Sequence, residues 1–294
     1  MPTIWPLDPL ERPESRAALE AAGWTIDPDA HCHALYVRLS RVSKPMLTFL
    51  PDLRYVVTQT TGLDHIDLAE CERRGIKVVS LNGHPRLSDV RATAELTVGL
   101  ILALTRRIPW AAQHVRAGGW ERYPFEGMDL AGKLVGIVGC GRIGKIVRRT
   151  LIMGFDCLTW DHDDLRDRNR PVWMERLGKC DIITVHATLN DSTRGMFGPT
   201  EFAAMKPGAL FINTARGGIV DTDALLDSLE SGHLGGAALD VVAGEPDIPP
   251  RLVKAANEMP NLIVTPHIGG CTREALAATE AMVIEAFLGA VADG

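Results

Sequence analysis

Residues 133–161 have the sequence KLVGIVGCGRIGKIVRRTLIMGFDCLTWD, and the order of residue types in this stretch predicts a complete supersecondary unit. An apolar run over 134–138 leads into the glycine string Gly139 to Gly144. A segment with helical apolar periodicity follows, and a second short apolar run ends in Asp161. This order predicts a strand, a glycine turn, a helix and a second strand.

The glycine turn favours dinucleotide binding. Gly139 permits the tight turn, Gly141 lets a pyrophosphate approach the backbone, and Gly144 lets the helix lie close to the strand. The N-terminus of the helix directs free N–H groups at the phosphates. Asp161 can accept hydrogen bonds from both ribose hydroxyls and would repel a 2′-phosphate, so the expected cofactor is NAD and not NADP. A glycine turn alone can be purely structural, but the whole unit ending in an acidic residue favours the cofactor.

Length, charge and cysteine usage narrow the class of protein. A chain of 294 residues predicts two domains. A net charge of −6 with scattered Lys and Arg gives no basic patch, so we expect a small-molecule partner, no nucleic acid and no membrane. The first residues lack a signal-peptide pattern, and no apolar run approaches about 20 residues, which predicts a cytoplasmic protein. Six cysteines without CxxC spacing predict reduced thiols and no metal site.

Strands and helices alternate on both sides of the glycine turn, which predicts an α/β fold. Before the turn, the expected strands are 34–39, 54–58 and 76–80, and the expected helices are 14–22, 45–50 and 68–74. After Asp161, the expected strands are 182–186, 210–213, 236–241 and 262–264, and the expected helices are 199–204, 221–231 and 272–291. A long apolar helix over 87–107 is a core or subunit-interface helix, and the connector 118–127 is a loop or an arm across a dimer.

We therefore expect two domains. A doubly wound parallel (Rossmann) NAD domain should span residues 86–271. A smaller, discontinuous, flavodoxin-like α/β substrate domain should combine residues 1–85 with 272–294.

Three charged residues lie just beyond predicted strand ends: Arg216, Glu245 and His267. In a doubly wound fold this edge of the sheet carries the site. Arginine offers a two-pronged donor for a carboxylate, histidine titrates near neutral pH, and a neighbouring glutamate can orient the histidine ring. Each residue alone also has a plain interpretation, as a surface ion pair, a turn residue before proline, or a loop histidine.

Four strings together resemble one family. VGIVGCGRIG (135–144), INTARGGIVD (212–221), ALDVVAGEP (238–246) and TPHIGG (265–270) are similar to those of the D-isomer-specific 2-hydroxyacid dehydrogenases, particularly the phosphoglycerate dehydrogenase branch. The resemblance runs from about Val37 to the last residue. It implies that Arg216, Glu245 and His267 are the catalytic residues.

The resemblance also implies binding roles. For the cofactor, Arg142 and Ile143 would contact the pyrophosphate, Asp161 the adenine ribose and Asp240 the carboxamide, and the remaining lining residues would be Ala187, Thr214, Gly269 and Gly270. For the substrate, Thr61 and Gly62 match the loop that receives the carboxylate. Arg38 and Arg41 are candidates for a distal phosphate, or form an exposed basic turn. His186 also falls on a family position, but we interpret it as structural.

The leading hypothesis is an NAD-dependent oxidoreductase that transfers a hydride between nicotinamide and C2 of a small D-2-hydroxy or 2-keto acid. Candidate substrates are 3-phosphoglycerate and the pair glycerate/hydroxypyruvate, and a homodimer is expected. One alternative is an NAD(H)-sensing, corepressor-like binding protein, for which catalysis would be dispensable. Another is a dehydrogenase of a phosphite-type oxyanion, which only assays can separate.

Overall fold

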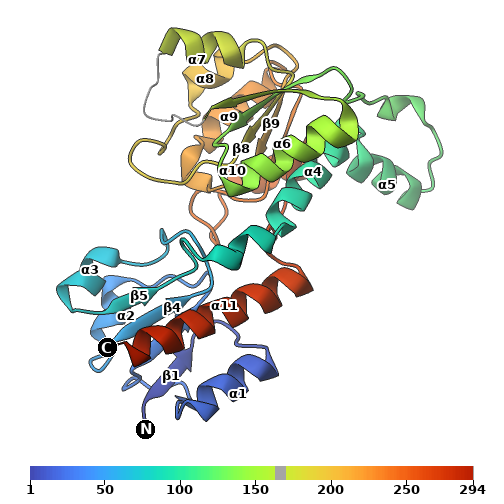
Figure 1. The fold of residues 1–294 in the computed structure, drawn as a ribbon. Coiled ribbons are helices and arrows are strands. Elements are labelled where there is room, and N and C mark those ends of the chain that lie inside the picture. Colours follow the sequence, from blue (N-terminus) through green and yellow to red (C-terminus); the bar gives the residue numbers. More distant parts are fainter. Residues whose placement is uncertain (163–169, 294) are drawn as a thin grey trace. The chain divides into compact units, whose positions relative to one another are not determined.

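The computed structural model describes residues 1–162 and 170–293, except for the side chains of residues 160–171. The chain forms two compact units (Figure 1). Unit 1 consists of Met1–Val90 and Thr272–Gly294, and unit 2 consists of Arg91–Cys271. The first boundary lies at 90/91 and not at the expected 85/86, because the 3₁₀ helix η1 (Pro85–Asp89) buries Leu87 in the core of unit 1.

Unit 1 is built on a five-stranded parallel sheet with the order β2-β1-β3-β4-β5. This is the flavodoxin-like order, as expected. The strands are β1 (Thr3–Pro6), β2 (Thr25–Ile26), β3 (Ala34–Val37), β4 (Tyr55–Thr58) and β5 (Lys77–Val79). Helices α1 (Pro13–Ala21) and α11 (Arg273–Ala292) cover one face, and α2 (Lys44–Thr48) and α3 (Leu68–Arg73) cover the other.

Helix α11 supplies much of the core of unit 1, although it is far from the other elements in sequence. Met282, Val283, Ile284 and Phe287 are buried, and the Phe287 ring makes edge contacts with Trp24 and Tyr55 at centroid distances of 4.8 and 5.4 Å. By length and composition alone α11 could cross a membrane, contrary to the expectation that no segment approaches such a span. Its buried face instead packs on the sheet.

Unit 2 is built on a six-stranded parallel sheet with the order β11-β10-β9-β8-β6-β7. The strands are β6 (Leu134–Val138), β7 (Leu158–His162), β8 (Ile182–Val185), β9 (Leu210–Asn213), β10 (Gly236–Leu239) and β11 (Leu262–Val264). The chain moves from β6 to β7 on one side and then returns to β8 on the other. The carboxyl end of β6 is therefore the switch point of a doubly wound sheet, where ligands collect.

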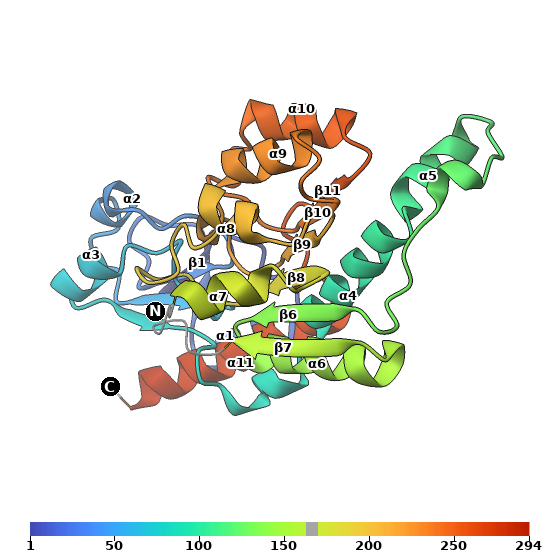
Figure 2. The same ribbon diagram turned by 90° about the horizontal axis from the view of Figure 1, so that it is seen from above.

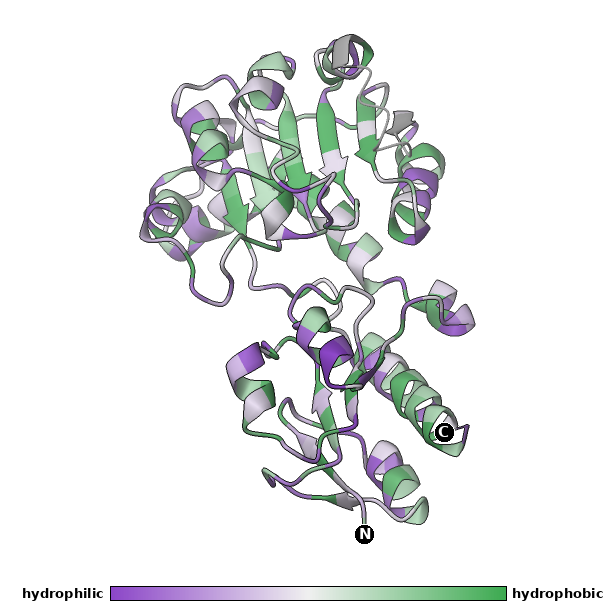
Figure 3. Ribbon diagram, turned by 90° about the vertical axis from the view of Figure 1, so that its left-hand side faces the viewer, coloured by the Kyte–Doolittle hydropathy of each residue, from purple (hydrophilic) through white to green (hydrophobic). Residues whose placement is uncertain are grey.

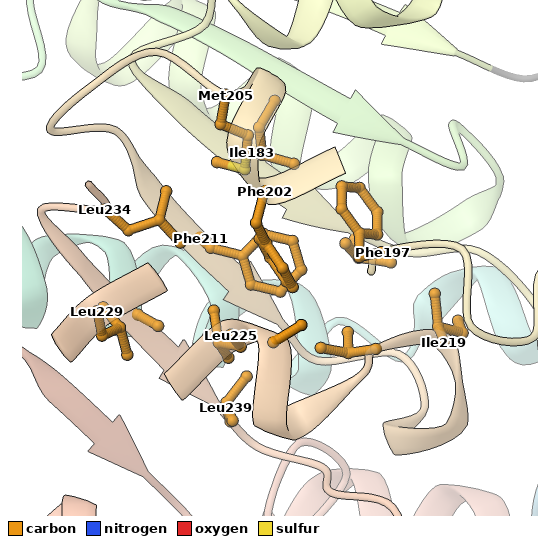
Figure 4. Close-up of a cluster of buried hydrophobic side chains, with 14 of the residues drawn as sticks. Ile183, Phe197, Phe202, Met205, Phe211, Ile219, Leu225, Leu229, Leu234 and Leu239 are labelled. Carbon is orange, nitrogen blue, oxygen red and sulfur yellow. The ribbon is translucent and has the colours of Figure 1, made fainter. Parts of the chain in front are cut away.

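Helices cover both faces of this sheet, whose strands are predominantly apolar (Figure 3). One face is covered by α4 (Ala92–Thr105) and α6 (Arg142–Phe155). The other is covered by α7 (Arg170–Leu177), α8 (Pro199–Ala204), α9 (Thr222–Glu230) and α10 (Pro250–Glu258). On that second face the Phe211 ring packs edge to face with the rings of Phe197 and Phe202 (Figure 4).

Several elements differ from the sequence prediction. Strands β1 and β2 and helices α5 (Ile108–Arg116) and α10 were not predicted. The long helix expected over 87–107 begins only at Ala92, because η1 and the extended residue Val90 precede it. Helix α5 and the connector that follows, with the short 3₁₀ helix η2 (Tyr123–Phe125), project away from the sheet of unit 2 (Figure 2).

Candidate active site

The sequence-predicted residues of unit 2 line the carboxyl edge of its sheet. From one side of the sheet to the other, β7 carries Asp161, β6 leads into the glycine loop, β8 leads into Ala187, β9 into Arg216, β10 into Asp240 and β11 into His267. The expected ribose-binding residue and the expected proton-transfer residue thus lie on opposite sides of the switch point. An extended ligand can lie along this edge.

The three glycines of the loop meet different surroundings. Gly139 has φ +91°, and a Cβ on it would lie 2.6 Å from the backbone nitrogen of Ala187. A Cβ on Gly144 would lie 2.4 Å from the carbonyl oxygen of Gly139, whereas one on Gly141 would meet no atom within 4 Å. Gly139 and Gly144 therefore serve the turn and the helix packing, and Gly141 leaves backbone open to a ligand. This is the arrangement that a dinucleotide pyrophosphate requires.

Arg142 and Ile143 are the first two residues of α6, at the helix N-terminus where an anion is stabilised. Burial lowers the pKa of Arg142, but a guanidinium stays charged at physiological pH. Asp161 is the fourth residue of β7 and pairs with Ile137 in the register of the sheet. Its side chain lies outside the described part of the chain, so its ribose contact stays a prediction.

His267 and Glu245 form a side-chain pair. Nδ1 of His267 lies 2.8 Å from Oε1 of Glu245, and both side chains are partly exposed. Because Nδ1 is held by the carboxylate, Nε2 is the ring nitrogen that is free to exchange a proton. His267 adopts a left-handed backbone with φ +51°, which is strained for a residue with a Cβ.

The carboxylate of Asp240 holds the strained loop in place. Its Oδ1 accepts from Thr265 Oγ1 at 2.6 Å and from the backbone N–H of Ile268 at 2.8 Å, and its Oδ2 accepts from the N–H of Gly269 at 2.7 Å. Asp240 is 1% exposed. The structure thus gives Asp240 a positioning role that sequence reasoning missed, and its expected contact with a carboxamide stays a prediction. Gly269 is buried beside it, and Gly270 is exposed.

Arg216 follows β9 in a loop that packs against the loop after β10. A Cβ on Gly217 would lie 1.9 Å from the carbonyl carbon of Val242, so only glycine fits and the backbones of the two loops touch. Buried Asn213 fixes the backbone of the Arg216 loop. Its Nδ2 donates to the Arg216 carbonyl at 3.0 Å, and its Oδ1 accepts from the Ala215 N–H. The loops that carry Arg216 and Glu245 are therefore in contact.

Two further residues directly follow strands of this sheet and make contacts of their own. The hydroxyl oxygens of Thr214 and Thr97 of α4 lie 2.8 Å apart. The two residues are 117 positions apart in the chain, so sequence reasoning could not anticipate this hydrogen bond. His186 follows β8, and its Nε2 lies 3.0 Å from the hydroxyl of Thr184. Burial lowers the pKa of His186 to about 4, so the ring is neutral near pH 7.

Apart from Arg216, the expected substrate residues belong to unit 1. Thr61 and Gly62 lie in the loop after β4, where the hydroxyl of Thr60 donates to the Gly62 carbonyl at 2.8 Å. Arg38 follows β3 and is half-buried, with its Nη2 3.4 Å from the Pro9 carbonyl oxygen, whereas Arg41 is exposed. Backbone N–H groups of residues 38–40 converge on the carboxylate of Asp8 and lower its pKa against the effect of burial. The Asp8 carboxylate thus occupies the three backbone N–H groups beside the Arg38 side chain.

The strand order, the glycine loop at the switch point and the paired side chains along one edge define a doubly wound dinucleotide-binding domain. The sequence profile of the family described as "D-isomer specific 2-hydroxyacid dehydrogenase, NAD binding domain" matches residues 98–269. The chain belongs to this family. Unit 2 is accordingly its NAD-binding domain, and the three loop glycines fit that cofactor.

Individual relatives agree with this assignment. The chain is 37% identical over 263 residues to D-3-phosphoglycerate dehydrogenase of Bacillus subtilis, which covers 87% of this chain and 49% of the relative. It is 38% identical over 239 residues to glycerate dehydrogenase of Methylorubrum extorquens, covering 77% and 72%. D-lactate dehydrogenase of Aquifex aeolicus, solved with NAD and lactic acid, shares the fold with a TM-score of 0.84 at 24% identity, covering 99% and 96%.

Many of these relatives are longer proteins. The chain spans about half the length of the phosphoglycerate dehydrogenases that it matches.

Proposed function

We propose that this protein is an NAD-dependent oxidoreductase that interconverts a small D-2-hydroxy acid and the corresponding 2-keto acid. The observation that carries the proposal is the 2.8 Å pair of His267 and Glu245, beside the loop of Arg216 on the carboxyl edge of an NAD-binding domain. NAD, held at the glycine loop and the N-terminus of α6, would supply or accept the hydride at C2 of the substrate.

The side chains of the protein do the remaining chemistry. The guanidinium of Arg216 matches a substrate carboxylate with two parallel hydrogen bonds. In reduction, Nε2 of protonated His267 donates a proton to the C2 oxygen as the carbonyl becomes an alcohol, and in oxidation neutral Nε2 takes that proton back. Glu245 holds Nδ1 and stabilises the charged ring, and Asp240 holds the loop.

Purified protein should oxidise NADH in the presence of at least one of glyoxylate, hydroxypyruvate, pyruvate or phosphohydroxypyruvate. Replacing His267 with alanine should lower kcat/KM at least about 100-fold, because proton transfer to the C2 oxygen is lost. The matched control is His233→Ala, since His233 bonds the Met205 carbonyl and lies near the amino ends of the strands. Absence of turnover across the panel, or equal loss in both variants, would contradict the proposal.

The cofactor preference depends on Asp161. We expect the protein to prefer NADH to NADPH, and Asp161→Ala should weaken that preference. Equal use of the two cofactors by the unmodified protein would remove the role assigned to Asp161 while leaving the fold unaffected.

The assembly is expected to be a cytoplasmic homodimer with no nucleic-acid or membrane partner. Support for the dimer comes from exposed apolar side chains on α5 and its connector. At least half of each of these side chains is exposed, and Trp120 is 88% exposed; they are Ile108, Val115, Trp120 and Tyr123. A second subunit that covered these side chains would gain roughly 25 cal/mol per Å² of apolar surface. A monomeric mass by light scattering would contradict the dimer.

A further inference from the structure

Helix α4 carries a buried hydroxyl at a position where an apolar side chain is expected. Thr97 is 0% exposed and lies three and four residues before Leu100 and Ile101, which pack in a hydrophobic core of unit 2. Residues at this spacing share one face of a helix. A buried hydroxyl is stable there only when it has hydrogen-bond partners. The partners of the Thr97 hydroxyl therefore decide what this residue contributes.

Two oxygens lie within hydrogen-bond distance of the Thr97 hydroxyl. One is the carbonyl oxygen of Thr93, one turn earlier in the same helix, at 2.7 Å, and the other is the hydroxyl oxygen of Thr214, at 2.8 Å. A carbonyl can only accept, so the single hydrogen of the Thr97 hydroxyl goes to Thr93. Thr214 then donates its own hydrogen to Thr97. Thr214 is 6% exposed, so loss of the Thr97 oxygen would leave a buried donor unpaired.

The bond between the two hydroxyls fastens the start of the Arg216 loop to helix α4. Thr214 is the first residue after β9, and Nη1 of Arg216 donates to the carbonyl of the next residue, Ala215, at 2.8 Å. The guanidinium is thus tied to the backbone beside Thr214. A shift of Thr214 would move the Ala215 carbonyl and, with it, the group that is expected to bind the substrate carboxylate.

The same end of α4 also packs against the loop of His267. A Cβ on Gly269 would lie 3.2 Å from Cγ2 of Thr93 and 2.9 Å from Oδ2 of Asp240, so the backbone of Gly269 is held between the helix and that carboxylate. Thr93 lies one turn before the threonine that bonds the other loop. The first two turns of α4 therefore contact both loops of the candidate active site.

We propose that Thr97 is a positioning residue, whose hydroxyl anchors the Arg216 loop to α4 and so keeps the Arg216 guanidinium at a fixed place relative to the His267 loop. This inference rests on the proposed function for the role of Arg216, whereas the anchoring is a property of unit 2 alone. Thr97 acts on the substrate only through Thr214 and Ala215.

The first measurement is amide hydrogen exchange in the protein without substrate. Thr97→Val keeps the shape of the side chain and removes the acceptor of the Thr214 hydrogen. The amides of Ala215, Ile219 and Val220, which are hydrogen-bonded in this part of the chain, should exchange about 10- to 100-fold faster, the effect of one buried donor left unpaired. Thr97→Ser retains the hydroxyl and should restore slow exchange.

The second measurement is steady-state kinetics with NADH and the 2-keto acid of the panel that is turned over best. A displaced guanidinium binds the substrate carboxylate less well in the ground state and in the transition state alike. Thr97→Val should therefore raise KM about 5- to 30-fold and change kcat less than about 3-fold. Loss of stability alone would reduce the amount of active protein, and with it the apparent kcat, at an unchanged KM. The split between KM and kcat thus separates positioning from stability.

The matched control is Thr105→Val in the same helix. Thr105 is also buried, and its hydroxyl also donates to the carbonyl four residues earlier, that of Ile101, at 2.9 Å. Within the described part of the chain no hydrogen bond joins this hydroxyl to a loop of the site. The control variant should leave both the loop exchange and KM unchanged.

The outcomes decide the two parts of the proposal separately. Equal loop exchange in Thr97→Val and Thr105→Val would overturn the anchoring. Faster exchange with an unchanged KM in Thr97→Val would overturn the positioning of Arg216. If no 2-keto acid is turned over, the proposed function fails, and hydrogen exchange alone decides whether Thr97 anchors the loop.

Discussion

Asp240 shows, at the scale of a single residue, how one buried carboxylate can fix the shape of a loop. Its three hydrogen bonds join the end of β11 to the turn that carries His267. The turn includes a left-handed residue, whose conformation persists only when its surroundings enforce it. The position of the His267 ring thus depends on one carboxylate.

Replacing Asp240 with asparagine should lower kcat about 10-fold or more while changing KM for NADH much less. An amide nitrogen cannot accept, so one of the three donors loses its acceptor and the loop loosens. Steady-state kinetics and amide hydrogen exchange over residues 265–270 would measure both effects. Thr265→Val removes one donor together with its need for an acceptor, and should have the smaller effect. An unchanged kcat and exchange rate in Asp240→Asn would contradict the positioning role.

His186 makes stability depend on pH. Its folded-state pKa of about 4 lies below the ordinary value of 6.5, so the stability it contributes is complete above pH 6.5 and is lost as the pH falls toward 4. We expect a loss of about 1 to 2 kcal/mol between pH 7 and pH 5 from this residue. Denaturant unfolding of the wild type and of His186→Gln at both pH values would measure it. The same pH dependence in both proteins would contradict this assignment.

At the scale of an element, the unit of β6, the glycine loop, α6 and β7 could be predicted from sequence. The residues that mark where each of its elements begins and ends are close together in the chain. The glycines end a strand and begin a helix within a few residues, and the two apolar periods differ. Strands β1 and β2 gave no such signal. They have four and two residues, and β1 ends in Pro6. They join the sheet only because β1 pairs with β2 on one side and with β3 on the other.

The site could be predicted in part for the same reason. Arg216 and His267 each follow a recognisable strand, and the ends of parallel strands share one edge of a sheet. The contacts that hold them are tertiary: Thr97 with Thr214, Gly217 against Val242, and Asp240 with the turn after β11. No local pattern in the chain reports such contacts.

The glycine loop offers a prediction at this scale. Gly139→Ala should destabilise the protein by at least about 2 kcal/mol and abolish NADH binding, since its φ is +91° and its Cβ would strike the backbone of Ala187. Gly154→Ala, within α6 and facing open space, should instead stabilise by up to about 1 kcal/mol. Thermal unfolding and NADH fluorescence titration would check both. Similar stability of the two variants would contradict this interpretation of the loop.

At the scale of the whole molecule, unit 2 is inserted within unit 1. The sheet of unit 1 comes from residues before 90, and the helix that covers one of its faces comes from residues after 272. Phe287 alone contacts two aromatic rings in that core. Each unit nevertheless has its own hydrophobic clusters, with no cluster shared between them among the described residues.

Deleting residues 272–294 should unfold unit 1 and leave unit 2 folded and able to bind NADH. The deletion removes four large side chains from the core of unit 1 and none from unit 2. Limited proteolysis with mass spectrometry should show cleavage confined to residues 1–90. Phe287→Ala, which costs about 3 to 5 kcal/mol, is the milder control. Protection of unit 1 in the deleted protein would contradict the account of α11.

The place of α11 in the chain also bears on how the protein folds as it is made. A ribosome adds residues from the N-terminus at about 5 to 20 per second, and domains usually fold in that order. Here the first strands to emerge must wait for α11 to cover them, whereas unit 2 is complete once residue 271 has left the exit tunnel. The domain begun first is therefore finished last. Its uncovered apolar face is the surface that a nascent-chain chaperone would meet.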